Sequence, residues 1–175
     1  VIIVDNGSTD NTLEVIRNSF IYKNKLIKLT EVNKNTGYGN GIKKGINSST
    51  GNFIGWCHGD LQTDMKDIIF SYEKNKNVLE EKNSVLKGIR TNRSLFDNFF
   101  TKTMAFIVKL FFKVNISDIN AQPKIFPRKF LKELVNAPND FSFDLFFLLK
   151  AKLNNYDIIE YPLIWYDRQH GEAKG

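Results

Sequence analysis

Acidic and amide side chains follow three predicted strands of this sequence. They are Asp5 with Asn6, then Asn35, then Asp60 with Gln62. In a parallel sheet such turns lie along one edge, where ligands bind in open α/β folds. Carboxylate and amide oxygens at that edge suit a base and ribose, or a magnesium or manganese ion that carries phosphate oxygens. The sequence therefore favours a phosphorylated ligand there, although the Asp5 turn taken alone is also typical of a tight turn that caps a helix.

A second set of side chains carries positive charge. Arginine binds phosphate through a bidentate fork, so two or three such groups would hold a phosphate ligand. The basic residues considered for this role are Arg90, Arg93, Lys102, Lys124, Arg128 and Arg168. For Arg93 and most of the lysines, a solvated surface position is the simpler interpretation. The formal net charge of +6 suits a phosphate-rich partner but does not choose among nucleic acid, an anionic membrane and a small molecule.

Composition excludes several kinds of site. Cys57 is the only cysteine, so no intramolecular disulfide forms, and its apolar neighbours favour a buried, inert thiol. Only two histidines are present, which excludes a zinc site of His and Cys ligands. The glycine-rich loop lacks the Gly-x-Gly-x-x-Gly pattern of dinucleotide-binding dehydrogenases, and no aromatic-basic motif indicates a nucleic-acid partner. No stretch reaches the apolar length that spans a bilayer.

Strands and helices alternate through the first ninety residues. The β-branched run Val1 to Val4 is typical of a strand covered on both faces, and further strands are predicted at 25–32, 53–57 and 84–89. Helices are predicted between them, one of them directly after the glycine-rich loop 35–41. This order predicts βαβ units, and hence an α/β fold with a mainly parallel central sheet flanked by helices. With apolar residues at 42% and charged residues at 25%, we expect one globular domain over 1–175.

The second half is richer in aromatic residues. A long helix is predicted at 96–112, a short strand at 119–126, a helix that begins near Pro127, a helix at 143–153, and a last strand at 157–165. The apolar residues of 99–112 cover more than one face, with lysines between them. An interfacial helix on a membrane and a core helix packed on the sheet are both compatible with this pattern.

Three segments carry a resemblance to a known family. Val4 to Thr12 (VDNGSTDNT), Asn35 to Gly51 with its Asn-x-Gly-x-Gly start, and His58 to Asp64 (HGDLQTD) resemble successive blocks of the family-2 glycosyltransferases. Later segments are similar to the dolichyl-phosphate mannosyltransferase branch of that family. They are Lys87 to Arg90, Asp118 to Asn120 with Lys124 and Arg128, Phe141 to Asp144, and Tyr161 to Lys174. The resemblance implies the Rossmann-like GT-A fold of nucleotide-diphospho-sugar transferases.

The resemblance also implies an activity, namely inverting transfer of a sugar from a nucleotide-diphosphate sugar to a polyprenyl phosphate such as a dolichyl or undecaprenyl phosphate. It implies nucleotide-sugar binding by Asp5, Asn6, Ser8, Asn35, Gly37 and Gly39. It implies that Asp60, Gln62 and His58 hold Mg2+ or Mn2+, and that the acceptor phosphate is bound near Arg90, Lys102 and Arg168. Such an enzyme is expected in the cytoplasm, peripheral at the inner face of a membrane.

The sequence departs from the family pattern at three points. The family's first strand, with its Pro-x-Tyr-Asn-Glu segment, is expected to be lacking from residues 1–175. Asn6 stands where the turn usually has a second aspartate, and His58 replaces the first aspartate of the Asp-x-Asp block, although a neutral imidazole still ligates manganese. Two alternatives remain open: a family-2 enzyme that extends a cell-surface glycan on a sugar hydroxyl, and an inactive nucleotide-sugar-binding module. A hydroxyl acceptor would need a general base, for which Asp118 is the candidate, with a turn cap as its other interpretation.

Overall fold

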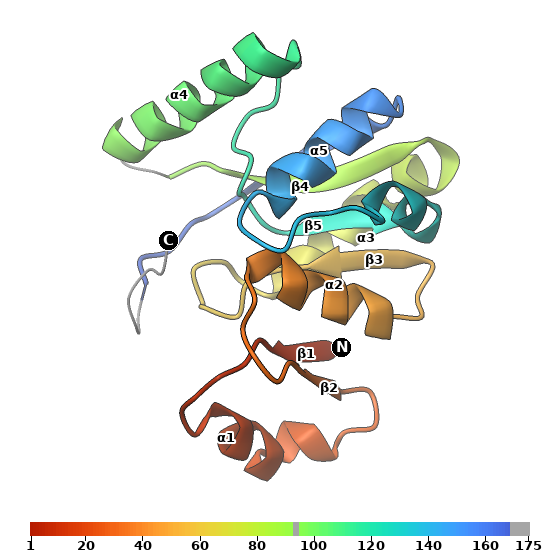
Figure 1. Cartoon of the computed structure of the whole chain (residues 1–175). Coiled ribbons are helices and arrows are strands. Elements are labelled where there is room, and N and C mark those ends of the chain that lie inside the picture. Colours follow the sequence, from red (N-terminus) through yellow and green to blue (C-terminus); the bar gives the residue numbers. More distant parts are fainter. Residues whose placement is uncertain (93–94, 169–175) are drawn as a thin grey trace.

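Six strands in the described part of the chain form two sheets. The computed structural model describes residues 1–92 and 95–168 (Figure 1). The strands are β1 (Ile2–Asp5), β2 (Lys28–Glu31), β3 (Phe53–Trp56), β4 (Ser84–Arg90), β5 (Lys124–Pro127) and β6 (Asp157–Leu163). β1 pairs in parallel with β2, and the second sheet has the order β3-β5-β4-β6. β5 runs antiparallel to both of its neighbours, whereas β4 and β6 are parallel. The predicted α/β fold with mainly parallel strands is confirmed, with β5 as the antiparallel exception.

Helices cover both faces of the larger sheet. They are α1 (Thr12–Asn18), α2 (Tyr38–Ser48), α3 (Lys66–Glu81), α4 (Leu95–Phe112) and α5 (Phe143–Leu153), with short 3₁₀ turns at Phe20–Lys23 and Arg128–Leu134. Alternate strand residues point to opposite faces. Val85 therefore packs in an apolar cluster with α5, while its neighbour Leu86 packs with Leu79 of α3.

The region around Pro127 differs from the sequence prediction. The predicted strand 119–126 begins only at Lys124, because Pro123 has no N–H to donate to a ladder. The helix predicted near Pro127 is present as the 3₁₀ helix Arg128–Leu134. Pro127 precedes it as the last residue of β5, where it pairs with Phe53.

The two sheets are not joined by a strand within the described residues. β1 pairs only with β2 and β3 only with β5, so each keeps one edge without a ladder partner. Helix α2 holds the sheets together, since it packs on β1 and its Ile46 shares an apolar cluster with Ile54 of β3. The lack of the family's first strand from residues 1–175 stays a proposal, and the free edges of β1 and β3 support it.

A hollow of about 360 Å³ lies beside β3 and under α3, lined by Phe53, Gly55, Ile68, Ile69, Tyr72, Asn52 and Ile125.

Helix α4 stands at the opposite end of the molecule from α1 (Figure 1). Only Val108 of its large apolar side chains with described burial is buried, at 2% exposed. Phe106 and Leu110 are each 65% exposed, and Phe111 is 75% exposed. The helix therefore does not act as a core helix in this chain. No helix among the described residues is both long and apolar enough to cross a bilayer.

Candidate functional site

The turn after β1 is packed against the loop after β2. Asp5 is buried and accepts the Ser8 N–H at 3.2 Å and the Ser8 hydroxyl. The Asn6 amide donates to the Gly37 carbonyl at 3.1 Å and lies 3.4 Å from the Asn35 side-chain oxygen. Gly7 has a φ of +79°, and a Cβ there would lie 2.5 Å from the Asn35 nitrogen, so no larger residue fits. The two segments predicted to bind the nucleotide sugar, the turn after β1 and the loop after β2, thus form one packed unit.

The glycines of the second loop are required by a close approach of backbone. Asn35 accepts the Gly37 N–H at 2.9 Å, which closes a short turn before α2. A Cβ on Gly37, whose φ is +125°, would lie 2.3 Å from the Asn139 carbonyl oxygen, and one on Gly39 would lie 2.4 Å from that of Pro138. The segment before α5 therefore fixes the start of α2.

The third turn follows β3 and brings three predicted metal ligands together. The Nδ1 of His58 lies 3.9 Å from Asp60 Oδ2, and Asp60 Oδ1 accepts the Gln62 N–H at 3.2 Å. The hydroxyl of Tyr38, the first residue of α2, lies 3.0 Å from His58 Nε2. All three predicted turns consequently meet at one edge.

The guanidinium group of Arg168 contacts the side-chain oxygens of this third turn. The Arg168 Nη2 donates to Asp60 Oδ2 at 3.0 Å and to Gln62 Oε1 at 2.9 Å. The segment that carries Arg168 is held in place because the Tyr166 N–H donates to the Gln62 carbonyl at 2.9 Å. Arg168 was predicted to bind an acceptor phosphate, and the structure places it directly on the predicted metal ligands.

The donor set of this turn fits a divalent ion. The oxygens of Asp60 and Gln62 converge on a single positive charge, which is the arrangement that a hard cation needs. Burial lowers the pKa of His58, against the opposing charge of Asp60, so the imidazole is neutral near pH 7 and has a lone pair to offer. The described residues hold no cluster of three or more Asp, Glu, His or Cys side chains, so Gln62 would complete the set.

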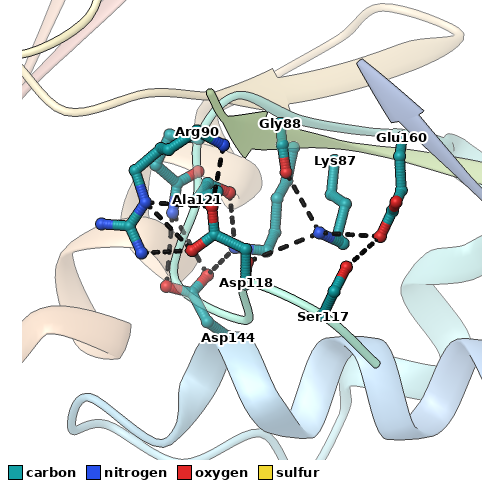
Figure 2. A network of polar contacts seen from close by, with 10 residues as sticks. Lys87, Gly88, Arg90, Ser117, Asp118, Ala121, Asp144 and Glu160 are labelled. Carbon is teal, nitrogen blue, oxygen red and sulfur yellow. Dashed lines mark hydrogen bonds and ion pairs between the residues drawn. The ribbon is translucent and has the colours of Figure 1, made fainter. Parts of the chain in front are cut away.

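Arg90 and Asp118 form a buried pair (Figure 2). The Arg90 Nε lies 3.0 and 3.1 Å from the two carboxylate oxygens, and the Arg90 backbone N–H donates to Oδ2 at 2.8 Å. The side chains are 11% and 6% exposed, and the guanidinium lies 4.8 Å from the Trp165 ring centre. Burial alone would raise the pKa of Asp118, but the hydrogen bonds and charge of Arg90 lower it further than burial raises it. The roles of Asp118 as general base and of Arg90 as phosphate ligand stay predictions, and each would require this pair to open.

Two buried lysines were not recognised as core residues from the sequence. Lys124 was considered as a phosphate ligand, but it is 0% exposed and its Nζ lies 2.7 Å from Asp144 of α5. Lys87 is also 0% exposed, and its Nζ lies 3.2 Å from Glu160, which also accepts the Ser117 hydroxyl (Figure 2). Burial lowers the pKa of both lysines, and the acidic partners oppose that shift. The sequence offered one signal for such a pair, namely Asp144 within the apolar run of α5.

The remaining basic residues lie elsewhere. Lys102 is exposed on α4. Arg128 donates to the Gly51 carbonyl at 2.7 Å and to Ser49 at 3.1 Å, so it holds a turn. Arg93 and residues 169–175, with His170 and Lys174, lie outside the described residues.

The α/β fold, with three turns that meet near one strand edge, is the GT-A fold of nucleotide-sugar transferases, as superposition on solved structures shows. Crystal structures of glucosyl-3-phosphoglycerate synthase from Mycobacterium tuberculosis superpose on this chain. The complex with phosphoglyceric acid has a TM-score of 0.72 at 15% identity, over 98% of this chain and 61% of that one. The complex with Mn2+, uridine-diphosphate-glucose and phosphoglyceric acid has a TM-score of 0.68 at 14% identity, over 95% and 60%. At this identity the likeness shows the fold alone.

Sequence comparison gives the family. The model of glycosyl transferase family 2 matches residues 1–135, and the chain belongs to that family. A dodecaprenyl-phosphate galacturonate synthase of Rhizobium johnstonii is 28% identical over 140 residues, which are 77% of this chain and 40% of that protein. The chain thus spans less than half the length of this relative.

The first prediction concerns the Arg90–Asp118 pair. Asp118→Asn leaves a buried guanidinium without its anion, so we expect the free energy of unfolding at pH 7 to fall by about 3 kcal/mol. Because the folded-state pKa of Asp118 is lowered, its contribution is present above about pH 4 and is lost as the pH falls through the folded-state value. Urea unfolding at neutral pH and at about pH 3 measures both effects, since the difference should shrink in acid. Asp157→Asn, at an exposed site, is the control. Equal stability at pH 7 would contradict the predicted contribution of the Arg90–Asp118 pair to folding.

Proposed function

We propose that this chain is the catalytic part of an inverting glycosyltransferase that moves a sugar from a nucleotide-diphosphate sugar to a polyprenyl phosphate. The observation that carries the proposal is that the side-chain oxygens of Asp60 and Gln62 converge on one positive group, the Arg168 guanidinium. This contact lies at the edge where the Asp5 and Asn35 turns also lie. Family membership supports the reaction class, and the dodecaprenyl-phosphate relative supports the acceptor class.

Nucleotide-sugar binding falls to the turns after β1 and β2. The side chains and backbone of Asp5, Asn6, Ser8, Asn35, Gly37 and Gly39 are the proposed contacts. Asp60, Gln62 and His58 would hold Mg2+ or Mn2+, which would supply positive charge to the leaving diphosphate. Mycobacterial structures of the same fold contain Mn2+ with uridine-diphosphate-glucose, or Mg2+ with uridine-diphosphate, which supports the cofactor proposal.

An oxygen of the acceptor phosphate attacks the anomeric carbon as the bond from that carbon to the diphosphate breaks, so the configuration inverts. A phosphate is already anionic near pH 7 and needs no strong general base. A phosphate acceptor is therefore compatible with the ion pair between Asp118 and Arg90, which leaves Asp118 unavailable as a general base. When Asp60 binds another cation, the Arg168 guanidinium loses its partner there and becomes available to a phosphate.

Helix α4 supports a partner at a membrane surface. Its exposed apolar residues are Phe99, Phe100, Met104, Phe106, Ile107, Leu110, Phe111 and Phe112. Lys102, Lys109 and Lys113 lie on or directly after the same helix and are exposed. A helix with a broad apolar face and flanking lysines binds the interface of an anionic bilayer, where a polyprenyl phosphate resides. We therefore place the enzyme at the cytoplasmic face of a membrane, held there peripherally.

The second prediction concerns the metal. Asp60→Ala removes the only carboxylate of the proposed ligand set, so turnover of the nucleotide sugar in the presence of Mn2+ should be abolished. His58→Asp should preserve or increase the use of Mg2+, because it adds a hard anionic ligand. Release of nucleoside diphosphate is the measurement, in the full-length protein. Near-normal turnover by Asp60→Ala would remove the metal-site proposal.

The third prediction concerns the acceptor. Arg168→Lys loses a bidentate phosphate contact, so kcat/KM for a soluble short-chain prenyl phosphate should fall. The expected fall corresponds to a rise of about 2 kcal/mol in the activation free energy. Arg17→Lys, at an exposed ion pair with Glu31, is the matched control. Rates are compared with the prenyl phosphate and with a neutral glycan as acceptors. If only the glycan is ever a substrate, the glycan-extending alternative replaces the polyprenyl phosphate.

The fourth prediction concerns α4. Phe106→Glu with Leu110→Glu changes two exposed side chains, so the free energy of unfolding should stay within about 0.5 kcal/mol per site. Affinity for vesicles that contain anionic lipid should fall at least about tenfold, because two apolar contacts are lost and two negative charges are gained. Cosedimentation with vesicles measures it. Phe20→Glu, at a site 85% exposed, is the control. Unchanged cosedimentation of the α4 variant would contradict the membrane proposal.

A further inference from the structure

The hydroxyl of Tyr38 is shared by three side chains from distant parts of the sequence. It lies 3.0 Å from Asp144 Oδ2, 2.9 Å from Gln122 Nε2 and 3.0 Å from His58 Nε2. Asp144 is 2% exposed and Gln122 is 0% exposed. A phenol has one proton to donate and two lone pairs to accept with. The partners of Tyr38 therefore determine where its single proton goes.

Asp144 must accept that proton. Its Oδ1 accepts from the buried Lys124 Nζ at 2.7 Å, and its Oδ2 is the acceptor for the Tyr38 hydroxyl at 3.0 Å. Gln122 Nε2 also lies 3.3 Å from both Asp144 oxygens, which fixes the amide with its NH₂ group toward the carboxylate and toward Tyr38. The Tyr38 oxygen thus accepts from Gln122 and donates to Asp144. The indole N–H of Trp56 is near enough to lower the pKa of Tyr38 but makes no hydrogen bond among the residues that the structure describes, so the second lone pair of Tyr38 remains for His58.

The consequence for His58 is a defined tautomer. Since the proton of Tyr38 is directed to Asp144, the contact between Tyr38 and His58 Nε2 is a hydrogen bond only if Nε2 carries the hydrogen. In the neutral ring, Nδ1 then has the free lone pair. That nitrogen lies 3.9 Å from Asp60 Oδ2, on the side of the carboxylate that Arg168 contacts.

We propose that Tyr38 is a positioning residue, which together with Asp144 and Gln122 holds His58 as the Nε2–H tautomer and presents Nδ1 as a ligand beside Asp60. The tautomer follows from the contacts of the chain alone, whereas the ligand role of Nδ1 rests on the proposed metal site. An imidazole nitrogen beside one carboxylate favours manganese over magnesium, because nitrogen is a poor ligand for the harder ion.

The first test measures the tautomer without metal or nucleotide. Nitrogen-15 NMR of the imidazole rings at about pH 8, above the ordinary pKa of histidine, separates protonated from unprotonated nitrogens. His170→Gln assigns the signals, because the chain has two histidines. We expect His58 protonated at Nε2 in the unchanged protein and a shift toward a mixture in Tyr38→Phe. A hydrogen on Nδ1 in the unchanged protein would overturn the proposal, even if Tyr38→Phe failed to fold.

The second test uses Mn2+ alone as the probe. Outer partners of a ligating histidine typically contribute 10- to 100-fold to metal affinity, so Tyr38→Phe should weaken Mn2+ binding by about tenfold or more. Tyr72→Phe is the matched control, since Tyr72 lies on α3 and packs against Phe53. Equal Mn2+ affinity in Tyr38→Phe and the unchanged protein would overturn the ligand role of Nδ1. An unchanged protein with the expected tautomer that binds no Mn2+ would instead overturn the metal part of the proposed function.

Discussion

The buried ion pair between Lys124 and Asp144 is the interaction on which the site depends. Both side chains are almost fully removed from water, and an unpaired charge in such a place costs several kcal/mol. β5 and α5 must therefore stay at the separation that gives the 2.7 Å contact. The remaining hydrogen-bonding capacity of Asp144 is filled by Gln122 and by Tyr38, which opens α2. The strand, both helices and the turn after β3 are consequently positioned by one buried carboxylate.

Three carboxylates near the strand edge are each paired with a cation from another element. Asp144 holds Lys124 in the core, Asp118 holds Arg90 at the end of β4, and Asp60 holds Arg168 from the segment after β6. These pairs differ in exposure. Both members of the first two are nearly buried, whereas Asp60 and Arg168 have side chains 21% and 30% exposed. Water screens the third pair most, so it is the pair that an incoming metal or phosphate exchanges at the lowest free-energy cost. Asp60 is therefore the carboxylate at which a metal ion would most easily replace the paired arginine.

Local patterns in the sequence predicted the strands and the three turns, because alternation and strand-end composition depend on neighbouring residues. The contacts that make the site specific join residues far apart, such as Tyr38 with Asp144, 106 positions away, and Arg168 with Asp60, 108 positions away. No local pattern contains such a pairing. Lys124 was considered as a phosphate ligand because lysine is usually exposed, and only the position of Asp144 in space accounts for its burial. The antiparallel direction of β5 was missed for the same reason, since four residues carry no signal of direction.

The two halves of the candidate site are held in different ways. The turn with His58 and Asp60 follows β3, which pairs along its length with β5 and so inherits the rigidity of the larger sheet. The turn with Asp5 and Asn6 follows β1, whose one partner is β2, and the two-stranded sheet is attached mainly through α2. Its position relative to Asp60 depends on side-chain contacts such as Asn6 with Gly37 and Val4 with Gly45. A strand between β1 and β3 would replace these contacts with two backbone ladders. The distance between the nucleotide turn and the metal ligands would then be set by strand spacing, which is nearly invariant.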